Sequence, residues 1–159
     1  MIPREEFDAI NTKEFAAAVN KEGVIEKNKK HYSRFVLQEL EDIKNKKRTF
    51  GANVSFGSKL KILIYLNWLL KFLDMKVIHK EPEKLGEEMR LSQNNVKTIL
   101  SQFFVTSNST KEQDKVVYTR NAMLTDKLIC YILILALFYG DFDLNATALI
   151  ANLKIEPKK

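Results

Sequence analysis

The sequence has 159 residues, which is the length of one ordinary domain or of two small ones. Hydrophobic residues make up 45% of it and charged residues 29%, a composition that is typical of folded globular proteins and excludes large-scale disorder. The 26 lysines and arginines outnumber the 20 acidic residues, and the resulting net charge of +6 suits a polyanionic partner, although proteins without such a partner reach the same value.

Residues 1–57 are predicted to form a helical linker or appendage. A short helix is expected over Lys13–Asn20. A longer helix is expected over residues 30–47, because apolar side chains recur there at spacings of three and four residues. The longer helix ends in a basic cluster of Lys44, Lys46, Lys47 and Arg48.

A first domain is predicted over residues 58–124. Ser58 is expected to cap a helix that is apolar on nearly all sides and therefore buried. Pro82 opens a second helix and Ser92 caps a third, so that these two short helices form a helix-turn-helix. Two β-prone runs, 104–106 and 116–119, follow, and we expect them to pair as a hairpin. A helix-turn-helix followed by a hairpin predicts a winged helix.

Residues 125–159 begin the same pattern again. Thr125 is expected to cap an apolar core helix over residues 127–139, with Cys130 buried inside it. This helix is too short to span a bilayer, so no membrane partner is predicted. A constant offset relates five residues of the first unit to five of the second, namely Leu85, Met89, Arg90, Leu91 and Ser92 to Leu149, Leu153, Lys154, Ile155 and Glu156. Only three residues follow Glu156. The predicted fold class is therefore mainly α: a tandem winged helix whose second unit is truncated, with a helical N-terminal linker.

Candidate DNA-binding residues lie on three segments. The outward face of the third helix carries short polar side chains and one cation, which suit phosphate and base-edge contacts: Asn94, Lys97, Thr98, Ser101 and, at its edge, Gln102. Further candidates for phosphate contacts are Lys111, Lys115 and Arg120 in and after the hairpin, and Lys44, Lys46, Lys47 and Arg48. Each segment also has a structural alternative. The face of the third helix can simply be solvated, and Glu112 and Asp114 dilute the charge of the hairpin loop. The basic cluster at the end of its helix can compensate the helix dipole.

The sequence contains no pattern that is typical of catalysis. His31 and His79 stand far apart, without cysteine or paired carboxylates at ligand spacing, so no metal site is predicted. A glycine-rich phosphate loop, a nucleophile elbow and a zinc signature are all missing from the sequence. We therefore expect neither an enzyme nor a cofactor, and no small-molecule substrate.

The two apolar runs, residues 58–72 and 125–137, and the stretch 2–10 resemble the C-terminal half of the forty-nine-kilodalton subunit family of RNA polymerase I. The resemblance implies a non-catalytic tandem winged-helix module, related to the β-subunit of general transcription factor E, that binds double-stranded DNA near the polymerase cleft. It also implies a role in initiation and elongation on ribosomal RNA genes, the other polymerase I subunits as partners, and a location in the nucleus and nucleolus. The family's N-terminal dimerisation domain has no counterpart in these residues.

A second class of function stays open beside this one. Winged helices also serve as scaffolds between proteins, since a fold does not fix a function. Residues 125–159 carry four basic and four acidic residues, which favours protein contact over DNA contact for that segment. The alternative is therefore a protein-interaction adaptor within a multisubunit complex, without direct DNA binding.

Overall fold

The computed structural model describes residues 2–108 and 115–155, and the chain divides into two compact units. Unit 1 comprises residues 1–9 and 71–131, and unit 2 comprises residues 10–70 and 132–159. These units differ from the three predicted domains, whose boundaries are at residues 57/58 and 124/125. The chain passes from one unit to the other after Ala9, and then twice more within two long helices, after Leu70 and after Tyr131. The predicted mainly α fold class is confirmed, because all but three of the described elements are helices.

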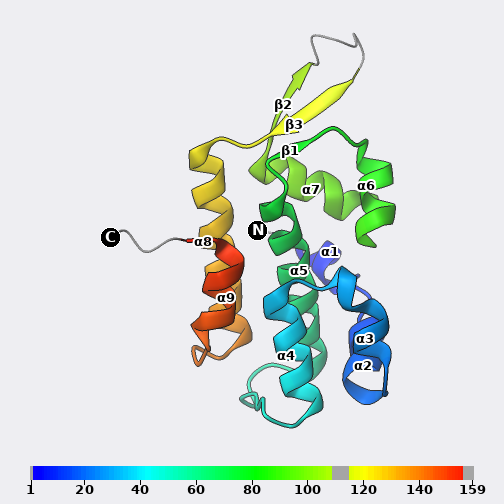
Figure 1. Cartoon of the computed structure of the whole chain (residues 1–159), viewed down its shortest axis with the longest axis vertical. Helices are drawn as coiled ribbons and strands as arrows, with labels where there is room; N and C mark the ends of the chain where they lie inside the picture. Colours follow the sequence, from blue (N-terminus) through cyan, green and yellow to red (C-terminus); the bar gives the residue numbers. More distant parts are fainter. Residues whose placement is uncertain (1, 109–114, 156–159) are drawn as a thin grey trace. The chain divides into compact units, whose positions relative to one another are not determined.

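Unit 1 combines helices with a small sheet (Figure 1). Its elements are α1 (Arg4–Asp8), the end of α5 (Phe56–Asp74), β1 (Val77–Ile78), α6 (Pro82–Met89), α7 (Gln93–Phe103), β2 (Val105–Asn108), β3 (Val116–Thr119) and the beginning of α8 (Ala122–Tyr139). Strand β3 lies between β1 and β2 and is antiparallel to both, so that Thr119 is opposite Val105 on one side and Val77 on the other. The predicted hairpin is confirmed. The two-residue strand β1 was not predicted.

The turn between α6 and α7 is tight. Arg90 ends α6 in the left-handed region with φ 57°, and the Leu91 N–H donates to the Gly86 carbonyl oxygen at 2.8 Å. A Cβ at position 86 would lie 3.0 Å from the Leu91 carbonyl oxygen, so glycine permits this close approach. Ser92 then caps α7 as predicted, its Oγ accepting from the Asn95 N–H at 3.2 Å.

All the described elements of unit 2 are helices. Its elements are α2 (Lys13–Asn20), α3 (Val24–Asn28), the 3₁₀ helix η1 (Lys29–His31), α4 (Arg34–Lys44), the beginning of α5, the end of α8 and α9 (Ala146–Leu153). The helix predicted over residues 30–47 is shorter than expected, because η1 is a separate turn and Ser33 caps α4. Within this unit α9 is bound to α4, where the Phe35 N–H donates to Asn152 Oδ1 at 2.6 Å. Lys154 ends α9 in the left-handed region, as Arg90 ends α6.

Helix α8 differs from the core helix that the sequence predicts. Asn121 caps it, accepting from the Leu124 N–H at 2.8 Å, so the helix begins before the predicted cap Thr125. Only one face is buried in its second half, and Phe138 on the other face is 57% exposed. Cys130 is also exposed, which corrects the expectation of a buried thiol. Among the described helices α8 is long and apolar enough to cross a membrane, which corrects the expectation that it is too short, and the core helices of soluble proteins reach the same length and composition.

Candidate nucleic-acid interface

The outward face of α7 presents three of the predicted residues to solvent. Asn94, Lys97 and Ser101 are exposed, while the opposite face of the helix is buried in the core of unit 1 through Val96, Ile99, Leu100 and Phe103. This division follows from the helical period, which places residues three and four apart on one side. Gln102, at the edge, is half-buried. Helix α7 therefore offers a short polar surface with one cation.

An acidic residue lies on that same face. The Thr98 hydroxyl is 3.1 Å and 3.0 Å from the two carboxylate oxygens of Glu6 and donates to them. Glu6 comes from α1, about ninety positions earlier in the chain, so no local pattern reveals the pairing. Its negative charge opposes phosphate binding at the centre of the predicted surface.

The cations of the hairpin have different positions. Lys115 is exposed immediately before β3, whereas Lys111 lies outside the described residues. Arg120 is turned inward, where its guanidinium donates to the carbonyl oxygens of Phe72 and Leu73 at 2.9 Å and 2.8 Å. It therefore caps the C-terminus of α5, a favourable place for a cation. Burial lowers the pKa of Arg120, and the nearby Asp74 carboxylate opposes that shift. The inward contacts of Arg120 exclude it from the interface proposed below.

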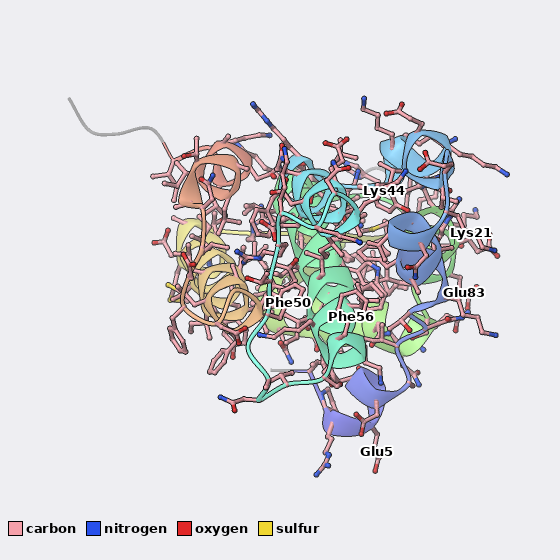
Figure 2. The ribbon with its side chains drawn as sticks, turned by 90° about the horizontal axis from the view of Figure 1, so that it is seen from below. Glu5, Lys21, Lys44, Phe50, Phe56 and Glu83 are labelled. Atoms are coloured by element: carbon pink, nitrogen blue, oxygen red, sulfur yellow. The ribbon has the colours of Figure 1, made fainter. Side chains whose placement is uncertain are left out.

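The basic cluster at the end of α4 is divided by the turn that follows the helix. Lys46 adopts the left-handed region with φ 57°, and the Lys47 N–H donates to the Asp42 carbonyl oxygen at 2.8 Å. This turn leaves Lys46 and Lys47 exposed. Lys44, which is labelled in Figure 2, is half-buried and forms an ion pair with Glu22 at 3.1 Å.

Arg48 is a structural residue of unit 2. Its Nε lies 3.2 Å from a carboxylate oxygen of the buried Glu39, and its guanidinium stacks over the rings of Phe50 and Tyr139. A Cβ at position 140 would lie 2.8 Å from the guanidinium, so Gly140 provides the space for it. Burial raises the pKa of Glu39, and Arg48 opposes that shift. Because the guanidinium is occupied in this way, Arg48 is also excluded from the proposed interface.

A second ionic group in unit 2 was missed by sequence reasoning. Lys59 is fully buried, and its Nζ donates to the carbonyl oxygens of Phe138 and Tyr139 at 2.8 Å and 2.9 Å and to Asp141 Oδ1 at 2.5 Å. The hydrogen bond from Lys59 holds the pKa of Asp141 below its usual value, and the Gly51 N–H adds to the effect. Phe50, labelled with Phe56 in Figure 2, covers this ammonium group with its ring. A lysine in the first turns of a helix that is expected to be buried on nearly all sides is the signal that sequence reasoning passed over.

The two units differ in charge. Unit 1 contains 11 basic and 11 acidic residues, and unit 2 contains 15 basic and 9 acidic residues. The whole net charge of +6 therefore belongs to unit 2. The helix-turn-helix and the hairpin belong to the neutral unit. A polyanion is attracted over a long range by the part of a protein that has a net positive charge. In this chain that part is unit 2.

These features define a small, mainly helical protein with a polar helix, a hairpin and an excess of cations at its surface; among residues 2–108 and 115–155 no cluster of potential metal ligands occurs. The chain belongs to the A49-like RNA polymerase I associated factor family, whose sequence model matches residues 1–159. The resemblance seen in the sequence is thereby confirmed. Membership makes the chain an accessory factor of RNA polymerase I rather than a catalytic subunit, with other polymerase I subunits as partners and a nuclear location. None of the curated proteins compared with the chain matches it.

Proposed function

We propose that the chain is a DNA-binding accessory module of RNA polymerase I that supports initiation and elongation on ribosomal RNA genes in the nucleolus. We further propose a tandem winged helix, of which α9 belongs to the second unit. The helix-turn-helix of α6 and α7, followed by the paired strands β2 and β3, supports the first winged helix. The left-handed caps Arg90 and Lys154, which correspond in the predicted repeat, support the second.

The observation that carries the proposal is the exposed polar face of α7. In a helix-turn-helix the second helix enters the major groove, and here that helix presents Asn94, Lys97 and Ser101 to solvent. The face has no arginine, the residue that most often reads guanine by two hydrogen bonds. Contacts from lysine and short hydroxyl or amide groups go mainly to phosphates, which carry no sequence information. The module therefore binds duplex DNA with little sequence preference.

Charge reversal at Lys97, Lys111 and Lys115 tests this interface. The triple glutamate variant should bind non-specific and promoter duplexes more weakly than the parent, and the slope of log K against log salt should fall by about three. The matched control replaces Lys76, Lys80 and Lys84, which are exposed in the same unit, by glutamate and gives the same net charge. If both triple variants bind equally, net charge alone governs binding and the α7 face is not the interface.

Glu6→Gln is expected to increase duplex affinity. The carboxylate at Thr98 repels phosphates approaching α7, and one such repulsion across about 4 Å of water costs roughly 1 kcal/mol, or about fivefold in affinity. Glutamine keeps the hydrogen bond to Thr98. The control is Glu5→Gln on the same helix, because Glu5 is fully at the surface and is directed outward in Figure 2. An equal gain from both variants would show that Glu6 does not act at the α7 face.

One observation favours a second function, contact with another polymerase I subunit. The end of α8 and Phe142 in the turn after it form an exposed apolar strip, composed of Leu133, Ile134, Leu137, Phe138 and Phe142. The rings of Phe138 and Phe142 are 5.8 Å apart and pack edge to face. Contiguous apolar surface of this kind is typical of protein interfaces and does not suit DNA phosphates. We propose that this strip binds a protein subunit of the polymerase.

Phe138→Glu tests the strip. The variant should lose binding to purified RNA polymerase I while its affinity for duplex DNA stays that of the parent, because a charge in the apolar strip opposes only the protein contact. Thr147→Glu introduces the same charge at an exposed polar position of α9 and serves as the control. Retention of polymerase binding by Phe138→Glu would contradict the proposed contact.

A further inference from the structure

We propose that unit 2 carries a second phosphate-binding surface for duplex DNA, the η1 surface, formed by Lys27, Lys29, Lys30 and Arg34. These residues lie on α3, on η1 and at the first position of α4. The inference rests on the proposed DNA-binding function and adds a contact site that the polar face of α7 does not include.

The charge of this segment is concentrated and exposed. All four side chains are at the surface, and they lie within eight consecutive residues. The acidic neighbour Glu26 pairs with Lys29 at 3.9 Å, but both side chains are more than half exposed. Such a pair contributes little and leaves the local charge strongly positive. The η1 surface is also in the unit that holds the whole net charge of the chain.

The backbone beneath these cations is fixed by buried contacts. The side chain of Asn67, buried on α5, accepts from the Ser33 N–H at 2.7 Å and donates to the His31 carbonyl oxygen at 2.9 Å. The Tyr32 hydroxyl is 3.2 Å from a carboxylate oxygen of Glu14, and its ring packs edge-on against Phe15. The cations on either side of these anchors, the lysines before them and Arg34 after them, therefore extend from a rigid backbone, which reduces the entropy lost when they bind a ligand.

Lys27, Lys29 and Lys30 lie in the last turns of α3 and η1, where a cation is favourable, but helix stability does not account for Arg34. Arg34 occupies the first turn of α4, which has no acidic residue, and a cation there opposes the helix dipole. A bound phosphate would offset that repulsion. The surroundings also favour DNA over a protein surface, because protein interfaces have an apolar centre. Within the described part of the chain, the large hydrophobic side chains that are exposed begin only at Val54.

The test uses the full chain with Lys27, Lys29, Lys30 and Arg34 all replaced by glutamine. Non-specific duplex binding should weaken at least tenfold at low salt, and the slope of log K against log salt should fall by about three to four. The matched control replaces Lys13, Lys76, Lys80 and Lys84, all exposed, by glutamine and removes the same charge. Circular dichroism and thermal unfolding establish that both variants are folded.

The outcomes separate this inference from the function on which it rests. Weaker binding and a lower slope for the η1 variant, but not for the control, support the η1 surface. If the η1 variant binds as the parent does while the Lys97, Lys111 and Lys115 variant is impaired, only the η1 surface is overturned. Loss of polymerase binding with unchanged duplex binding would assign the surface to an acidic protein and also overturn the inference. If the parent does not bind duplex, the proposed function fails as well.

Discussion

Replacing Arg48 by alanine is expected to lower the free energy of unfolding by about 3 kcal/mol, because a buried ion pair that loses one partner leaves the other uncompensated. The partner is Glu39, whose side chain is only 5% exposed. The substitution also removes the cation that lies over the rings of Phe50 and Tyr139. Urea unfolding, followed by circular dichroism, measures the change.

The control is Lys47→Ala, next to Arg48 in the sequence but exposed, which should change stability by less than about 0.5 kcal/mol. The comparison separates a structural from a DNA-binding role within one basic cluster. If the Arg48→Ala variant is as stable as the Lys47→Ala variant but binds duplex DNA more weakly, Arg48 has a DNA-binding role and not a structural one.

Lys59→Met is expected to destabilise the chain by about 2–4 kcal/mol, since the methionine keeps the apolar stem and removes all donors. The carbonyl oxygens of Phe138 and Tyr139 would then lose the ammonium group that binds the end of α8. Thermal unfolding should show a clear decrease in the transition temperature, and protection from hydrogen exchange should fall at the end of α8.

Lys61→Met, on the same helix but half-exposed, is the matched control and should leave the transition nearly unchanged. An equal decrease for both variants would mean that added surface hydrophobicity, and not the loss of the buried donors, causes the effect.

The sequence predicts the local elements of this fold well where one face of a helix is apolar. The cap at Ser92, the helix Lys13–Asn20 and the hairpin after α7 follow from side-chain spacing, caps and β-propensity, which act between near neighbours. Strand β1 has only two residues and exists because β3 pairs with it from about forty positions away. A partner at that distance leaves no periodic pattern in so short a run.

The candidate site could be predicted only in part, for a different reason. The spacing of the apolar residues shows which residues of α7 face outward. It does not show which residues from other elements contact that face, such as Glu6, which accepts a hydrogen bond from Thr98. Composition likewise does not distinguish a lysine in solvent from an arginine that caps a helix or pairs with a buried acid. Composition therefore predicts Arg120 and Arg48 among the exposed cations, whereas tertiary contacts bring both inward.

The division of charge changes how DNA binding is expected to work. A neutral unit with a polar helix can position the duplex, while the cations of unit 2 attract the phosphates. Affinity and orientation would then come from different units. Variants in unit 2 should mainly change the salt dependence, whereas variants on α7 should weaken binding to all duplex sequences.

The proposed function requires that the chain binds duplex DNA directly, through phosphate contacts. Its most direct test is the affinity of the full chain for a labelled non-specific duplex at about 50 mM and about 200 mM salt. Roughly six phosphate contacts predict binding about a thousandfold weaker at the higher concentration. Undetectable binding at both concentrations, or an affinity that does not change with salt, would contradict the claim and make the protein-interaction adaptor the better account.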